Sequence, residues 1–282
     1  MDYSQCHRSQ LYYSGSERKI GVIVDGEEWI LKFQYKDEFG SRFNHISEHL
    51  GSEIFRMLGI ESQTTALGTY KGEQVVACKN FITNGYQFVP FNDVGESTLE
   101  TNKEQFQYSY DDIMEMLNLN KKITDLEGTV DRFWDMYIID ALLGNFDRHG
   151  GNWGFLKNDN KYILAPVFDN GSSLFPQMTD EGMMLKIMDS EELTDERVYR
   201  FPTSQIKLHG RKSSYHDVIS SLEFTECNEA LERIYPRTRM DKINDLVNGI
   251  DQITDVHKRF YIHMIERRFE KILEEPYEKL IG

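Results

Sequence analysis

The stretch LLGNFDRHGGNWGFL, residues 142–156, concentrates charged and amide side chains between two apolar runs. It contains Asp147 and, five residues later, Asn152. Such side chains seldom build a core, because burying them without partners costs free energy. In a loop, Asp147 and Asn152 can face one cavity from its two ends. The stretch is therefore predicted to be a functional site.

A second aspartate, Asp169, follows an apolar run in YILAPVFDNGSSLF, where Gly171 permits a sharp turn. Oxygen ligands of this kind suit Mg²⁺ better than Zn²⁺. Asp-x-x-x-x-Asn followed by a strand and Asp-x-Gly matches the phosphotransferase pattern, in which the first aspartate orients the attacking hydroxyl and accepts its proton. We therefore predict Asp147 as the catalytic base, with Asn152 and Asp169 as Mg²⁺ ligands.

The same pattern requires a lysine and a glutamate earlier in the chain, to contact the α- and β-phosphates of ATP and to hold that lysine. Lys32 lies near the end of the apolar run EEWILKF, and Glu48 lies in the helical segment that follows. Glu53 competes with Glu48 but falls on a different face of that helix.

A turn that covers the phosphates should precede Lys32. The segment YYSGSERKIG, residues 12–21, is in the right place. Its central residues, Ser14, Gly15 and Ser16, are therefore predicted to contact the nucleotide.

The elements that position these residues can also be predicted. Asp25-Gly26 and Lys71-Gly72 each separate two short apolar runs and indicate hairpins. Apolar residues recur at helical spacing over residues 46–58, and an apolar stripe over residues 133–142 predicts a helix leading into the 142–156 stretch. The expected fold is α+β, with a β-rich lobe at residues 1–84 that contains one helix and a mainly helical lobe at residues 85–282.

Composition limits the classes of function. The chain has 282 residues and a formal net charge of −15, which argues against nucleic acid or an anionic membrane as the main partner. We expect no membrane span and no secretory signal, because neither a long apolar run nor an apolar N-terminal region is present. Three scattered cysteines indicate a reducing compartment. A cytoplasmic location is expected, with signal-less secretion into a host cell as the alternative.

Four segments resemble the HipA-like family of bacterial serine/threonine kinases: EEWILKF, SEHLGSEIFRMLGI, LLGNFDRHGGNWGFL and APVFDNGSSLF. The likeness extends from about residue 19 to the final helices. It implies a bilobal protein-kinase-like fold, ATP and Mg²⁺ as cofactors, and an unidentified protein substrate phosphorylated on Ser or Thr. Autophosphorylation is expected for the same reason.

The resemblance also implies roles for individual residues. Residues 76–81 would form the hinge whose backbone reads the adenine edge, with Val76, Ala77, Cys78 and Lys79 as nucleotide contacts. Arg148 and His149 would shape the catalytic loop and carry no proton.

One departure from the family leaves alternatives open. The family's phosphate loop is usually glycine-rich, whereas residues 13–19 contain a single glycine. A pseudokinase or nucleotide-gated interaction module is therefore one alternative. A lipid or small-molecule kinase is another, because phosphoinositide kinases share D-R-H-x-x-N. A metallohydrolase using His149 lacks a second histidine at ligand spacing. Ser213 and Ser214, in HGRKSSYHD, are expected in a solvated loop, with a phosphorylation site as the alternative.

Overall fold

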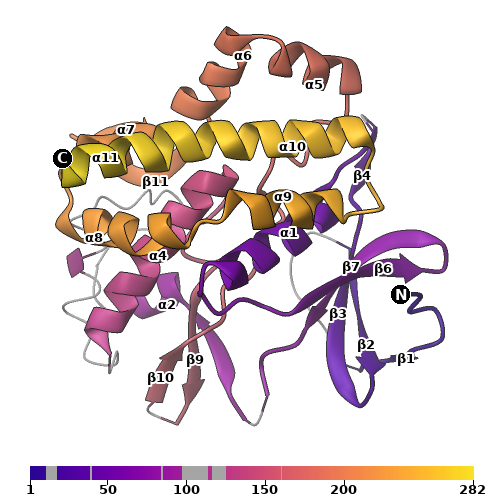
Figure 1. The fold of residues 1–282 in the computed structure, drawn as a ribbon. Coiled ribbons are helices and arrows are strands. Elements are labelled where there is room, and N and C mark those ends of the chain that lie inside the picture. Colours follow the sequence, from indigo (N-terminus) through magenta and orange to yellow (C-terminus); the bar gives the residue numbers. More distant parts are fainter. Residues whose placement is uncertain (11–17, 39, 84, 97–113, 116–124, 160) are drawn as a thin grey trace.

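The computed structural model describes residues 1–10, 18–38, 40–83, 85–96, 114–115, 125–159 and 161–282 (Figure 1). The strands are β1 (His7–Arg8), β2 (Lys19–Val24), β3 (Glu27–Phe33), β4 (Lys36–Asp37), β5 (Gly40–Ser41), β6 (Thr65–Tyr70), β7 (Glu73–Lys79), β8 (Gln87–Pro90), β9 (Gly154–Asn158), β10 (Lys161–Leu164), β11 (Thr203–Leu208) and β12 (Arg211–Ser214). The helices are α1 (Asn44–Met57), α2 (Phe91–Glu96), α4 (Leu126–Leu143), α5 (Glu181–Met188), α6 (Glu191–Asp195), α7 (Tyr215–Ser221), α8 (Thr225–Ile234), α9 (Met240–Asn248), α10 (Asp255–Arg268) and α11 (Glu275–Ile281), with shorter helical turns η1 (Glu196–Arg200), η2 (Tyr235–Arg237) and η3 (Phe269–Glu274).

Five antiparallel strands in the order β1-β2-β3-β7-β6 form the sheet of the N-terminal lobe. Both predicted hairpins are confirmed. The turn residues Asp25 and Gly26 have φ values of 51° and 80°, and Lys71 and Gly72 have 50° and 81°. Positive φ at both central residues is what a two-residue hairpin turn requires.

The two faces of this sheet carry different side chains. Leu31, Phe33, Val75 and Ala77 belong to a small apolar cluster on one face. Because side chains alternate along a strand, Lys32 lies on the opposite face, with the paired Val76 and with Cys78. The predicted helix over residues 46–58 is α1, which contacts β6 and β7.

The larger lobe is mainly helical and is built around α4, which is buried along most of its length (Figure 1). The side chain of Asp125 accepts a hydrogen bond from the Gly128 N–H and caps the start of α4, and Gly144, with φ 62°, ends it. The neighbouring helices α8 and α10 contact α4. The helix therefore delivers the chain from a fixed core directly into the loop at residues 145–153.

This arrangement confirms the predicted α+β, bilobal kinase-like fold. The lobe boundary near residue 84 stays a prediction. Beyond it, β8 pairs with β9 in a separate sheet of order β10-β9-β8.

One local prediction is wrong. Ser213 and Ser214 end strand β12 and are buried, where a solvated loop was expected. The Ser213 hydroxyl donates to the Arg211 carbonyl at 2.8 Å, and Ser214 forms a capping box with Asp217 at the start of α7. Small hydroxyl side chains can be buried when local backbone groups satisfy them in this way.

Candidate active site

Lys32 connects three elements that are far apart in the sequence. From β3, its Nζ lies 3.2 Å from Glu48 Oε1 on α1 and 3.1 Å from Asp169 Oδ1. The same Glu48 oxygen accepts a hydrogen bond of 3.1 Å from the backbone N–H of Asp169. Glu53 pairs instead with Arg56 on its own helix. The predicted Lys32–Glu48 pair is therefore present, and it extends to the Asp169 loop.

The two carboxylates control the charge of Lys32. Burial lowers the pKa of Lys32, but Glu48 and Asp169 outweigh that effect and hold it well above its ordinary value. The positive charge of Lys32 in turn lowers the pKa of Asp169 against the opposing effect of burial. Both groups are therefore charged at neutral pH.

Asp169 is held in an uncommon backbone conformation. Its φ of 59° lies in the left-handed region, which few non-glycine residues adopt. Two residues earlier, the segment pairs with the N-terminal lobe: the Gln63 N–H donates to the Val167 carbonyl at 2.8 Å, and the Val167 N–H donates to the Glu61 carbonyl at 2.9 Å. Strain that is maintained by surrounding contacts is common at functional sites.

The loop after α4 brings Asp147 and Asn152 together. The Asn145 side chain accepts a hydrogen bond from the Asp147 N–H at 3.0 Å. The Asn152 amide nitrogen donates to the Asp147 carbonyl oxygen at 2.9 Å. The carboxylate of Asp147 takes no part in these bonds and is half exposed. The loop thus fixes the backbone of Asp147 and leaves its side chain accessible.

His149 lies at the surface of this loop. Its Nδ1 accepts a hydrogen bond of 3.0 Å from the Gly151 N–H, while its Nε2 is 3.9 Å from Asp147 Oδ1. A ring that is bonded to the backbone in this way supports the conformation of the loop.

A buried arginine network lies beneath the loop. Arg148 donates to Asp140 at 2.8 and 3.2 Å, to the Phe168 carbonyl at 2.5 Å and to the Asn170 side chain at 2.5 Å. It also donates to the Asn152 carbonyl at 3.0 Å. Arg148 therefore joins α4, the Asp147 loop and the Asp169 loop into one unit.

Sequence reasoning predicted a loop-shaping role for Arg148 but missed its partners Asp140 and Asn170, both fully buried. Gly51 was missed as well. A Cβ atom at this position of α1 would come within 2.6 Å of the Asn170 side chain. The absence of a side chain therefore lets α1 approach the Asp169 loop closely. The one available signal was Asp140, a carboxylate next to the apolar stripe of α4.

Asp147 and Asp169 have pKa values shifted in opposite directions. Partial burial raises the pKa of Asp147, and this is partly offset by His149 and reinforced by repulsion from Asp169. The pKa of Asp169 is lowered by Lys32. Two carboxylates of opposite shift in one site are typical of a division between proton transfer and charge stabilisation.

The predicted nucleotide contacts have mixed outcomes. Ser14, Gly15 and Ser16 lie outside the described residues. The backbone of Val76, Ala77 and Cys78 cannot read adenine, because β7 is a central strand hydrogen-bonded to both β3 and β6. Ala77 also faces the cluster on the far side of the sheet.

Lys79 ends β7, where its N–H donates to the Thr64 carbonyl, and its side chain pairs with Glu27 at 2.7 Å. The prediction that the backbone of residues 76–79 forms the hinge is therefore wrong. It could not be corrected from the sequence, because the position of β7 between β3 and β6 is decided by contacts between distant segments. Beyond the sheet, the rings of Phe81, Phe88 and Phe168 cluster with centroids 5.1 to 6.3 Å apart.

Among the described residues, no three or more His, Cys, Asp or Glu side chains gather so as to hold a metal ion. A cation at Asn152 and Asp169 would have to share its shell with water and phosphate oxygens. Mg²⁺ commonly binds in this way.

Fold and site together define a protein kinase. The chain belongs to the HipA-like C-terminal domain family, whose sequence pattern matches residues 11–247. It is 34% identical over 270 residues to the serine/threonine-protein kinase CtkA of Helicobacter pylori strain J99, and the match covers 93% of this chain and 82% of that protein.

Solved structures agree. The crystal structure of a Helicobacter pylori proinflammatory kinase, CtkA, matches with a TM-score of 0.89 at 33% identity, covering 100% of this chain and 98% of that one. HipA of Shewanella oneidensis MR-1, solved with HipB and operator DNA, matches with a TM-score of 0.62 at 13% identity, covering 96% and 67%. The second match shows a common fold alone. Within the described residues, no helix is long and apolar enough to cross a bilayer.

Proposed function

We propose that this chain uses ATP and Mg²⁺ to transfer a phosphoryl group to serine or threonine hydroxyls of a protein. One observation supports this most strongly: Lys32 Nζ contacts Glu48 at 3.2 Å and Asp169 at 3.1 Å. Such an arrangement places a fixed cation beside a cation-binding carboxylate. Phosphoryl transfer depends on positioned charges of both kinds.

In this proposal Lys32 binds the α- and β-phosphates, and Glu48 fixes its orientation. Residues 14–16 cover the phosphates. The adenine edge is read after β7, in the segment that begins at Phe81, because the backbone of β7 is already paired. The rings of Phe81 and Phe168 would close the inner end of that site.

Asn152 and Asp169 would hold Mg²⁺, and their donor atoms fit it. The Asn152 amide nitrogen is bonded to the Asp147 carbonyl, so its amide oxygen is the atom left for a cation. Asp169 uses Oδ1 for Lys32 and retains a second carboxylate oxygen. When bound, Mg²⁺ neutralises charge on the transferred group.

Asp147 would orient the acceptor hydroxyl and accept its proton. Its raised pKa favours proton acceptance near neutral pH more than that of an ordinary aspartate does. The arginine network beneath it keeps the loop in place, so little reorganisation is needed during the reaction.

Ser and Thr are proposed as acceptors because the Helicobacter pylori relative is a serine/threonine-protein kinase. Autophosphorylation, the lobe boundary near residue 84 and a cytoplasmic location belong to the same proposal.

The test is transfer of label from γ-³²P-ATP to the chain itself and to dephosphorylated casein, with and without Mg²⁺. Acid hydrolysis then identifies the labelled amino acid. Label on serine or threonine that requires Mg²⁺ and is lost in Lys32→Ala supports the proposal. Release of label as inorganic phosphate alone, or label on tyrosine alone, contradicts it.

A further inference from the structure

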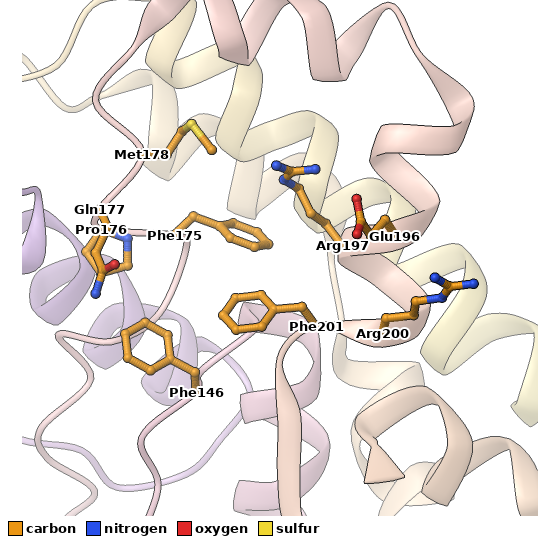
Figure 2. A pocket seen from close by; sticks show the side chains of 9 residues that line it. All are labelled: Phe146, Phe175, Pro176, Gln177, Met178, Glu196, Arg197, Arg200 and Phe201. Carbon is orange, nitrogen blue, oxygen red and sulfur yellow. The ribbon is translucent and has the colours of Figure 1, made fainter. Parts of the chain in front are cut away.

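A cavity of about 440 Å³ opens beside the catalytic loop. Three aromatic rings line it: Phe201 has its centroid 6.2 Å from that of Phe146 and 6.1 Å from that of Phe175. Figure 2 shows these rings around a common space, with Met178 and Arg197 at its upper side. Phe201 is 46% exposed although it is a large apolar side chain. The cavity is therefore an apolar binding site that no other side chain of the described residues occupies. We call this site, lined by Phe146, Phe175 and Phe201, the apolar seat.

The position of the cavity relates it to the acceptor. Phe146 immediately precedes Asp147, and Phe175 follows Asp169 by six residues. Successive Cα atoms of a peptide are about 3.8 Å apart. Because Phe146 lines the cavity, the cavity wall begins at the residue next to Asp147.

The walls of the cavity are held to the catalytic core. The buried Arg268 donates to the Ala141 carbonyl of α4 at 2.6 Å and to the Arg197 carbonyl at 2.7 Å. It donates to the Phe201 carbonyl at 3.3 Å. On the other wall, the Pro176 carbonyl accepts from the Phe43 N–H at 2.8 Å. The seat is therefore formed before any peptide arrives.

The chain next to the seat is basic over residues 197–216, although the protein as a whole is acidic and the preceding residues 189–196 include five Asp or Glu. Residues 197–216 contain five Arg or Lys and no Asp or Glu, against 47 acidic and 32 basic residues in the whole chain. Arg200 lines both the cavity and a second hollow that contains Lys212 and His216. Within the described residues, neither Arg200 nor Lys212 has a carboxylate partner.

Two carboxylates lie near these cations. Glu196 is on the rim of the first cavity. Asp217 lines the second hollow, where it accepts a hydrogen bond from the Ser214 backbone N–H at 3.1 Å in the capping box of α7. The unpaired cations Arg200 and Lys212 thus form a path that leads away from the apolar seat.

We propose that the seat and this path bind the acceptor segment of the protein substrate, and that they select acidic segments. A large apolar residue beside the acceptor serine or threonine occupies the seat of Phe146, Phe175 and Phe201. Acidic residues further along the segment pair with Arg200 and Lys212. This inference rests on the proposed kinase function and adds the chemistry of its substrate.

The test uses fluorescein-labelled peptides that carry one serine, an adjacent phenylalanine and a run of glutamates. In one set the phenylalanine and the glutamates follow the serine, and in the other set they precede it. Matched peptides replace the phenylalanine by alanine or the glutamates by lysines. Binding to the full chain is followed by fluorescence anisotropy at low salt. Phosphoryl transfer from Mg-ATP to the same peptides is measured in parallel.

We expect Arg200→Glu to raise the Kd of the acidic peptide about tenfold, which corresponds to about 1.4 kcal/mol, and to lower the Kd of the lysine peptide. Phe201→Ser should weaken the phenylalanine peptide and leave the alanine peptide unchanged. Arg259→Glu is the matched control, because Arg259 is an exposed arginine of α10 outside both hollows.

Equal effects of Arg200→Glu and Arg259→Glu, or equal binding of acidic and lysine peptides, would overturn the assignment. Transfer without any acidic preference would overturn it while leaving the kinase function intact. Peptides bound with the expected preference but not phosphorylated, by a chain that still labels casein, would refute the acceptor role of this surface. Loss of label on casein and on the chain as well would instead refute the proposed kinase function.

Discussion

Replacing Glu48 by glutamine removes one of the two charges that face Lys32 and changes little else. Glutamine has the same size and retains an oxygen that can accept the Asp169 N–H. The Glu48 side chain is 3% exposed and that of Lys32 is 14% exposed, so the lost charge is not replaced by solvent. The substitution therefore tests whether orientation of Lys32 by Glu48 matters for transfer.

The magnitude follows from burial. Removing one partner of a buried pair typically costs about 3–5 kcal/mol, and Asp169 remains as a partner of Lys32, so we expect about 1–3 kcal/mol of lost stability. For phosphoryl transfer, a loss of about 3 kcal/mol of transition-state stabilisation corresponds to a decrease in kcat/KM of about 10²-fold.

The assays are urea unfolding and initial rates of phosphoryl transfer over a range of ATP concentrations. Glu53→Gln is the control on the same helix. Its ion pair with Arg56 is partly exposed, so we expect the free energy of unfolding to change by less than about 0.5 kcal/mol and the rate of phosphoryl transfer to stay unchanged. If Glu48→Gln transferred phosphate as fast as Glu53→Gln, the role assigned to the Lys32–Glu48 pair would be wrong.

Three further predictions concern residues around the site. Burial lowers the pKa of His45 from 6.5 to about 4, so the unfolded chain takes up the proton first and stability falls as the pH falls from about 6.5 to 4. Between pH 7 and pH 4, the free energy of unfolding measured with urea should fall by about 3 kcal/mol more in wild type than in His45→Gln. An equal fall in both proteins would refute this. Arg148→Lys should lower kcat at least about tenfold, because an ammonium cannot reproduce the guanidinium's several bonds; Arg259→Lys should not. Gly51→Ala should displace Asn170 and weaken Mg-ATP binding measured by calorimetry, and unchanged affinity would argue against close packing of α1 on the Asp169 loop.

The sequence predicted the parts of the site that depend on local spacing. Asp147 and Asn152 are five residues apart in one loop that follows a helical stripe, and Asp169 follows an apolar run. Lys32 and Glu48 were identified by their order relative to that group. The structure brings Lys32, Glu48 and Asp169 into contact, as the phosphotransferase pattern predicts.

The parts that sequence reasoning missed depend on contacts between distant segments. The backbone of Cys78 was predicted to be free, because nothing local shows that β7 lies between β3 and β6. Asp140 reads as a solvent-facing residue until Arg148 is seen to pair with it at 2.8 Å. Ser213 was predicted to be solvated for the same reason. Polarity alone does not show whether a buried partner exists.

The most direct test of the account compares Asp147→Asn with the wild-type chain in a single turnover at saturating Mg-ATP. Nucleotide affinity is measured on the same samples by calorimetry. We expect transfer to fall by about 10²- to 10⁴-fold, because no base accepts the acceptor's proton, while the Kd for Mg-ATP stays within about threefold. Transfer by Asp147→Asn at a rate close to that of wild type would contradict the assignment of Asp147 as the base, and with it the mechanism proposed for this site.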